Sequence, residues 1–425
     1  MSGIARSFAF VFLVSCGLNI AFLFALHLPK SPDQLDMDAR EYFELAGHIA
    51  DGTYHFDSRR IPGHPLILAA LRKVTGSNLV TLQTLVTLFF CASAPLTYLL
   101  ARRFVTNDKI ALSAGLATVV WPPFIFYAHT LYSETTALPL FIGFLASLPR
   151  GLLLGQATAP NWRWLISGVL MALCMFVRPM YLVFLPFIPL ILWFEDARLM
   201  NVTRATALIG AGCFLTLTPW LVYSSCQAGT PILLSANMGE TLAGGLNPTL
   251  LEETNQKTYQ CPDGRMTWGG PGKWISEDHT QFLSKNELAL PRPERDRLLK
   301  KHVFDWILAN PGGALLLERS KLAYMWGIYP FWSGFLQTFF GNIPILILMT
   351  VGALSLFSFR KHLSQLSMLI TLPFFSSAVA LISWGSWRFR QPADVGLIIL
   401  LIFFIWSRIP SLKIQFRGTS GTEVV

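Results

Sequence analysis

The chain has 425 residues, of which 53% are hydrophobic and only 13% are charged. Soluble proteins carry about 25% charged residues, so this composition excludes an ordinary soluble protein and indicates a single membrane domain over residues 1–425. The net charge of +9 is by itself compatible with nucleic-acid binding. Most lysines and arginines, however, lie in short links between apolar segments, as membrane insertion requires. We therefore expect membrane lipids as partners and no nucleic acid.

Apolar segments along the chain predict about ten membrane spans, if the shorter ones tilt or use flanking residues to cross. They lie near residues 8–28, 79–101, 110–127, 134–149, 164–177, 180–195, 205–224, 336–358, 365–384 and 392–407. An eleventh span can be accommodated in the aromatic stretch 322–340. A lipoprotein-like sequence ends at Cys16, but the apolar run continues to Leu28, which favours an uncleaved first helix over a signal peptide.

Alternate links between these spans are basic, which predicts that both termini face the cytoplasm. The segments 29–78 and 225–335 then face outward, and the balanced charge of the second is allowed because long loops escape the charge rule. Cys226 and Cys261 both lie in the second segment and can form a disulfide in an oxidising compartment. The basic residues of the cytoplasmic links are Arg6, Arg102, Arg103, Lys109, Arg150, Arg163, Arg198, Arg204, Arg360, Lys361, Arg408, Lys413 and Arg417.

The first outward segment predicts two helices. Tyr42, Leu45, Ala46 and Ile49 recur at helical spacing, and we expect this amphipathic helix to lie on the membrane surface. A second helix is expected over about 64–75.

Two carboxylates are candidates for catalysis. Asp38 lies at the outer start of the first amphipathic helix, where a general base with a raised pKa is expected; the alternative is that Asp36 or Asp38 only caps the helix. Glu134 stands at the outer end of a helical hairpin. A carboxylate beside apolar spans is a functional-site candidate, although a helix N-terminus also favours an exposed glutamate.

Five arginines fall on the outward side, and guanidinium groups suit phosphate oxygens. The alternative for each one alone is contact with lipid headgroups. Together they indicate a phosphate site. These residues are Arg59, Arg60, Arg178, Arg388 and Arg390. Two lone histidines, His64 and His129, are weaker candidates for a ligand contact.

The short outward link from Trp384 to Gln391 breaks the charge rule, because it carries both Arg388 and Arg390. Pro392 disfavours a helical conformation at the residue before it, so we expect an extended link. Residues two apart in an extended chain point the same way, so both arginines are predicted to hold one phosphate.

The order of these motifs resembles the GT-C glycosyltransferases, and most closely the bacterial relatives of protein O-mannosyltransferases and of lipid A aminoarabinose transferases. The resemblance runs from about residue 30 to 405. It rests on Asp38-Ala39-Arg40-Glu41-Tyr42, Arg60-Ile61-Pro62-Gly63-His64-Pro65, Ser133-Glu134, Arg178-Pro179, Thr218-Pro219-Trp220, Gly244-Gly245-Leu246-Asn247-Pro248, Asn310-Pro311, Lys321-Leu322 and Arg388-Phe389-Arg390.

The resemblance implies an all-α GT-C bundle in a bacterial inner membrane, with its site facing the periplasm. It implies inverting transfer of a sugar from a polyprenyl-phosphate carrier to a hydroxyl group of a lipid, glycan or protein acceptor. Asp38 matches the family's catalytic aspartate, and Glu134 matches a second acidic position. Donor phosphate and sugar are then assigned to Tyr42, Arg59, Arg60, His64, Arg178, Lys321, Arg388 and Arg390.

Two positions depart from the family pattern and leave the donor sugar and the acceptor open. Mannosyltransferases often have Asp-Glu where this chain has Asp38-Ala39, and the aminoarabinose group has Glu-Lys where this chain has Arg59-Arg60. No cofactor and no metal cluster is predicted, because arginine and lysine can stabilise a lipid monophosphate leaving group. A divalent metal remains compatible with the sequence.

Two other functions remain as alternatives. A lipid-linked glycan polymerase or ligase is also polytopic and arginine-dependent. A transporter commonly shows internal repeats and broken helices in two halves, whereas this sequence shows neither and gathers its polar residues at the outer surface.

The alternating charges predict the topology directly. Reporter fusions placed after Arg360 and after Arg417 should both show a cytoplasmic location. A periplasmic signal at either position would contradict the ten-span topology with both termini inside.

Overall fold

The structure, a computed structural model, describes residues 3–25, 29–149, 160–195, 198–256, 279–328, 342–409 and 414–416. The described residues form helices and contain no strand beyond one isolated bridge between Val105 and Phe416. Most of the stretch 322–340, in which an eleventh span could be accommodated, lies outside the described residues. Cys261 also lies outside them.

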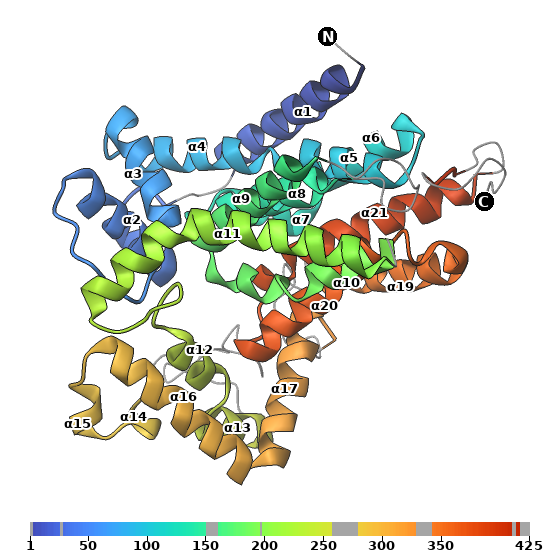
Figure 1. The fold of residues 1–425 in the computed structure, drawn as a ribbon. Helices are drawn as coiled ribbons and strands as arrows, with labels where there is room; N and C mark the ends of the chain where they lie inside the picture. Colours follow the sequence, from blue (N-terminus) through green and yellow to red (C-terminus); the bar gives the residue numbers. More distant parts are fainter. Residues whose placement is uncertain are drawn as a thin grey trace.

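The helices follow one another along the chain as Figure 1 labels them. The first half contains α1 (Gly3–Ala25), η1 (Pro32–Gln34), α2 (Met37–Ala50), α3 (Gly63–Thr75), α4 (Leu79–Phe90), α5 (Ser93–Phe104), α6 (Asp108–Val119), α7 (Pro122–Ala128), α8 (Glu134–Ser147), α9 (Asn161–Val177), η2 (Pro179–Phe184), α10 (Phe187–Glu195) and α11 (Leu199–Ala228). The second half contains α12 (Met238–Gly245), α13 (Pro248–Gln256), α14 (His279–Phe282), α15 (Lys285–Leu288), α16 (Arg292–Ala309), α17 (Pro311–Met325), α19 (Ile343–Ser358), η4 (Arg360–His362), α20 (Ser367–Ile382), η5 (Trp387–Arg390) and α21 (Gln391–Ser407).

In its described part, each of the ten predicted spans overlaps one helix or two consecutive helices. Among the described residues, four helical segments are long and apolar enough to cross a membrane, namely Gly3–Leu23, Leu79–Phe104, Leu199–Ala228 and Trp387–Ser407. The bent pair α6 and α7, with 56° between its parts, makes a fifth if it counts as one span. Helices α8, α9, α19 and α20 are apolar but shorter, so the count of ten spans stays a prediction.

The helices of the bundle pack closely where small residues meet. Helices α9 and α11 share the most extensive contact of the bundle. A Cβ atom on Gly168 of α9 would lie 2.2 Å from the Ile209 carbonyl oxygen, and one on Gly212 of α11 would lie 2.4 Å from the Leu165 carbonyl oxygen. Only glycine allows these two backbones to approach so closely, and such contacts are typical of helices that associate in membranes.

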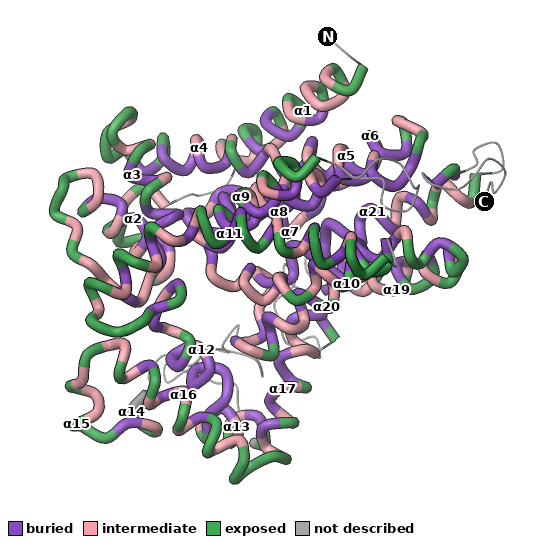
Figure 2. The backbone as a smooth tube through the Cα atoms, in the orientation of Figure 1, coloured by how far each residue is buried: buried purple, intermediate pink, exposed green. Residues whose placement is uncertain are grey.

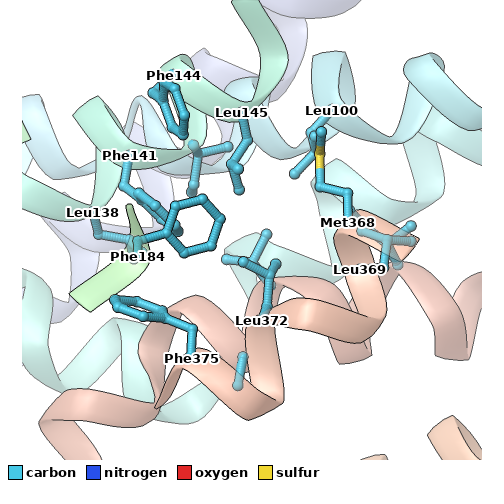
Figure 3. Close-up of a cluster of buried hydrophobic side chains, with 14 of the residues drawn as sticks. Leu100, Leu138, Phe141, Phe144, Leu145, Phe184, Met368, Leu369, Leu372 and Phe375 are labelled. Atoms are coloured by element: carbon cyan, nitrogen blue, oxygen red, sulfur yellow. The ribbon is translucent and has the colours of Figure 1, made fainter. Parts of the chain in front are cut away.

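An aromatic cluster forms the centre of the bundle, between α8, η2 and α20 (Figure 3). The ring of Phe141 lies 4.9 Å from that of Phe184 and 5.6 Å from that of Phe375, measured between centroids. The Phe141 and Phe184 rings meet edge-to-face at 87°, a favoured geometry of aromatic pairs, whereas the Phe141 and Phe375 rings are tilted at 33°. Figure 2 shows that buried residues run through this centre, while exposed residues alternate with buried ones along much of α11.

The first amphipathic helix packs against neighbouring helices. Tyr42 and Ala46 of α2 are buried against Leu68 of α3 and Leu82 of α4. The apolar stripe therefore faces other helices of the protein, and the position of α2 at the membrane surface stays a prediction. Helical periodicity identifies an apolar face but cannot distinguish a lipid partner from a protein partner.

The described part of the long outward segment has a small core of its own. Helices α12, α13, α16 and α17 bury a cluster that includes Leu242, Leu250, Leu299 and Leu317. In Figure 1 these helices lie together below the bundle, and the Ala236 backbone N–H, just before α12, donates a hydrogen bond to the Ser58 carbonyl oxygen of the first outward segment. This arrangement places α12 where it can contribute to a site shared with the first outward segment.

Candidate active site

A cavity of about 370 Å³ lies between the first outward segment, α12 and the link before α21. Its lining is strongly charged and combines four carboxylates with three guanidinium groups. The lining residues are Asp36, Asp38, Glu41, Arg59, Arg60, Tyr132, Asn237, Glu240, Thr241, Tyr324, Trp384, Gly385, Ser386 and Arg388. A charged, partly enclosed cavity at one end of apolar helices is the natural place to search for chemistry.

The two neighbouring aspartates of α2 have separate roles. Asp36 is the N-cap residue, because its side chain accepts a hydrogen bond of 3.0 Å from the Ala39 backbone N–H. Asp36 also contacts the Tyr132 hydroxyl group. Asp38 lies in the first turn and is not needed as a cap, so its carboxylate is available to the cavity.

Arg388 joins the two acidic residues that the sequence singles out. Its Nη1 lies 2.6 Å from Asp38 Oδ2, and its Nε lies 2.5 Å from Glu134 Oε1. Its guanidinium carbon also lies 4.1 Å from the centre of the Tyr132 ring. Residues far apart in the sequence are thus brought together around one guanidinium group.

Glu41 holds the two neighbouring arginines of the first outward segment. Its Oε1 lies 2.6 Å from Arg59 Nη1, and its Oε2 accepts a hydrogen bond of 2.7 Å from Arg60 Nε. Arg60 Nη2 lies 2.6 Å from Asp38 Oδ1. The sequence analysis missed Glu41, although its spacing of three residues from Asp38 places both on one helix face.

The expectation of a raised pKa at Asp38 is wrong. Burial raises the pKa of this carboxyl group, but the adjacent charges of Arg388 and Arg60 outweigh burial and bring the pKa below its usual range. Asp38 is therefore ionised at neutral pH. Its ion pairs contribute stability above about pH 4, and this contribution is lost as the pH falls through the lowered pKa.

Glu134 lies behind Arg388, with 2% of its surface exposed. Besides Arg388, it contacts Arg178, whose Nη1 lies 2.6 Å from Glu134 Oε2. The same Arg178 nitrogen donates a hydrogen bond of 2.7 Å to Ser133 Oγ. Two cations thus compensate a carboxylate whose burial would otherwise be costly.

Tyr42 packs between Arg60 of the cavity and the buried His64. The Tyr42 ring lies 5.1 Å from the Arg60 guanidinium carbon, and its edge packs on His64. His64 is fully buried; its Nε2 lies 3.0 Å from the Leu131 carbonyl oxygen and its Nδ1 lies 3.0 Å from Thr136 Oγ1. Burial lowers the pKa of His64 to about 4, so this imidazole is neutral and already satisfied within the protein.

Arg388 and Arg390 point to different partners. Residues Trp387–Arg390 form a 3₁₀ helix, and Gln391 already begins α21, so the expectation of an extended link is wrong. Proline is well tolerated in the first turn of a helix, and Pro392 occupies that place. Arg390 is fully buried and pairs with Asp394, whose Oδ1 lies 3.0 Å from Arg390 Nε.

Lys321 is also buried away from solvent. Its Nζ lies 3.0 Å from Glu318 Oε1 and donates a hydrogen bond of 3.1 Å to the Leu381 carbonyl oxygen. Burial lowers the pKa of this amine. A Cβ atom on Gly385 would lie 2.3 Å from the Lys321 carbonyl oxygen. Because Gly385 has no side chain, this cavity-lining residue can pack directly against the backbone of α17.

Several cavity residues lie in no sequence pattern that points to a site. Glu240 and Thr241 come from α12 and Asn237 from the position just before it, while Tyr324 and Trp384 come from segments that appear aromatic and interfacial in the sequence. Their approach to Asp38 depends on tertiary packing. Among the described residues, no group of three or more histidine, cysteine, aspartate and glutamate side chains is arranged to hold a metal ion.

The buried pair of Arg390 and Asp394 generates a prediction about stability. Arg390→Ala leaves the Asp394 carboxylate buried without its partner, which should cost about 3–5 kcal/mol. We expect a marked fall in melting temperature in detergent, followed by tryptophan fluorescence. Arg408→Ala is the matched control and should melt like the parent, because Arg408 is exposed just after the end of α21, the helix that carries Asp394. Equal melting of Arg390→Ala and the parent would show that this pair is unimportant.

The chain is similar in structure to two kinds of solved protein. Archaeal oligosaccharyltransferase AglB from Archaeoglobus fulgidus, solved in complex with an inhibitory peptide and a dolichol-phosphate, superposes with a TM-score of 0.53 and 13% identity over 95% of this chain. The chain covers 50% of the length of that protein. ArnT from Cupriavidus metallidurans bound to undecaprenyl phosphate gives a TM-score of 0.41 and 15% identity, with 95% of this chain and 78% of that chain covered.

No family model and no curated protein sequence matches the chain. The similarity to AglB extends over nearly the whole chain despite its low identity, and it agrees with the all-helical architecture. The chain therefore has the GT-C fold.

Proposed function

We propose that the protein is an inverting glycosyltransferase. It would move a sugar from a polyprenyl-phosphate carrier to an acceptor hydroxyl group at the periplasmic face of a bacterial inner membrane. The observation that carries the proposal is the contact of Arg388 with both Asp38 and Glu134, beside a charged cavity that Asp38 and Arg388 line at one end of the apolar helices. The AglB structure contains a dolichol-phosphate, which supports a lipid-phosphate donor for the shared fold.

The guanidinium groups of the cavity suit the donor phosphate. Arg59, Arg60 and Arg388 all line the cavity, and guanidinium groups bind phosphate oxygens through paired hydrogen bonds. When the bond between the anomeric carbon and the phosphate oxygen breaks, its electron pair moves onto the phosphate. Fixed positive charges stabilise that developing negative charge.

Asp38 is proposed to accept the proton of the acceptor hydroxyl group. In the arrangement seen here, Arg388 and Arg60 both neutralise Asp38, and the lowered pKa makes it a weak base. A bound phosphate would compete for the same guanidinium groups. When Arg388 and Arg60 contact the phosphate as well as Asp38, their positive charge stabilises the Asp38 carboxylate less, so the pKa of Asp38 rises. The acceptor oxygen then attacks the anomeric carbon from the opposite side and inverts its configuration.

Glu134 is proposed to position Arg388. It is buried behind the guanidinium group and is held there by Arg178. This role differs from direct contact with the acceptor, which would enter through the open side of the cavity. The acceptor would be a lipid, a glycan or a protein.

The role of Asp38 is tested by a pair of matched variants. Asp38→Asn should lower the transfer rate about 10²–10⁴-fold, because an amide cannot accept the proton. Asp36→Asn should keep most activity, because asparagine is as good an N-cap as aspartate. Transfer is followed as product formed by purified protein in detergent. Near-parental turnover by Asp38→Asn would exclude it as the base.

The role of Arg388 is tested by its affinity for undecaprenyl phosphate. Arg388→Ala should weaken binding by about 10-fold or more, as expected for loss of hydrogen bonds to a charged group. Arg388→Lys should recover only part, because lysine lacks the paired donors. Glu134→Gln should also weaken binding, but by a smaller factor than Arg388→Ala. If all three variants bind like the parent, the phosphate lies elsewhere.

The biological substrate is tested by mass spectrometry. Lipid A, surface glycans and secreted proteins are compared with and without the gene, and one of them should lose a sugar. If none changes, the proposed transfer activity is contradicted and a transporter becomes the better explanation.

A further inference from the structure

Three consecutive residues of the first outward segment contact the long outward segment. The Ser58 carbonyl oxygen accepts a hydrogen bond of 2.6 Å from the Ala236 backbone N–H. On one side of Ser58, Asp57 Oδ1 lies 3.6 Å from Arg292 Nε. On the other side, Arg59 Nε lies 3.3 Å from Glu240 Oε2. The two segments are therefore joined at residues 57–59 by backbone and charge contacts together.

Glu240 is the central residue of this junction. It lies on α12 with 7% of its surface exposed, and it also lines the cavity. While Oε2 faces Arg59, Oε1 lies 2.5 Å from Arg292 Nη1 and 3.9 Å from Arg295 Nη2. One carboxylate thus connects an arginine of the first outward segment with two arginines of α16.

The helix that carries Glu240 is itself fixed to α16. The backbone N–H of Gly239 donates a hydrogen bond of 2.6 Å to Asp296 Oδ1, and Asp296 is buried and pairs with Lys300 at 2.9 Å. The carboxylate of Glu240 therefore projects from a backbone that α16 holds in place. A side chain on such a support can hold Arg59 at a defined position.

We propose that Glu240 is a positioning residue, which fixes Arg59 in the donor cavity and couples that cavity to the long outward segment. The inference rests on the proposed function, because it assigns Arg59 to the donor phosphate. Arg59 has a second partner in Glu41 on α2. Glu240 and Glu41 hold the guanidinium group from two different segments, so the direction of Arg59 depends on both segments being docked.

The role of Glu240 is tested with substitutions of Glu240 itself, a substitution of its partner Arg292 and a control substitution nearby. Glu240→Gln removes the charge that holds Arg59 and Arg292, while Glu240→Asp keeps the charge on a shorter side chain. Arg292→Gln releases the other side of the junction. Glu294→Gln is the matched control, since Glu294 is exposed on the same helix as Arg292. None of these variants alters Asp38 or Arg388.

The first measurement is the affinity of each purified variant for undecaprenyl phosphate in detergent. Glu240→Gln should bind about tenfold more weakly than the parent, Glu240→Asp should recover part of the loss, and Arg292→Gln should weaken binding to a smaller degree. Glu294→Gln should bind like the parent. Parental affinity in Glu240→Gln would overturn the proposal, as would a loss that Glu240→Asp does not reduce at all.

The second measurement is amide hydrogen exchange of the protein without ligand. Glu240→Gln should speed exchange at the Ala236 amide and in α12, while the bundle helices keep their protection. This measurement does not depend on the proposed function. If the parent fails to bind undecaprenyl phosphate but the exchange at Ala236 responds, the donor assignment fails and the junction stands. Unchanged exchange at Ala236, or a loss of protection throughout the bundle, would overturn the junction itself.

Discussion

The rest of the candidate site depends on the ion pairs that the guanidinium group of Arg388 makes with two carboxylates. The guanidinium group lies between the carboxylates of Asp38 and Glu134, which come from α2 and from the start of α8. Without it, Asp38 would keep only Arg60 and the buried Glu134 only Arg178 as a partner, at the edge of an apolar bundle where a poorly compensated charge is costly. Because Arg388 has to reach both, the short helix η5 and the start of α21 have to be held against α8 and α2.

The surrounding charges follow from that arrangement. Glu134 needs a second cation, which Arg178 supplies, and Asp38 shares a second one, Arg60, with Glu41. The result is a continuous network of alternating charges that ends at Glu240 and α16. Such a network is well suited to receive a phosphate, since an incoming anion can take the place of Asp38 on Arg388 while Asp38 keeps Arg60 as its partner.

The sequence predicts the bundle well, because apolar length and alternating basic links are properties of single segments. It also identifies Asp38, Arg60 and Arg388 as candidates, and the structure places all three at one cavity. The sequence could not separate Arg388 from Arg390, because the difference depends on the buried partner Asp394 and on a proline that begins a helix. Likewise, Glu240 carries no local pattern, and its place in the cavity follows only from the docking of α12 on α16.

The central claim is that a lipid phosphate replaces Asp38 as a partner of Arg388. An experimental structure of the protein with undecaprenyl phosphate tests it most directly. The account predicts that the phosphate contacts Arg388, that the distance of 2.6 Å between Arg388 Nη1 and Asp38 Oδ2 increases, and that Glu134 keeps its contact. A phosphate bound outside this cavity, with the contact between Arg388 and Asp38 intact, would contradict the account.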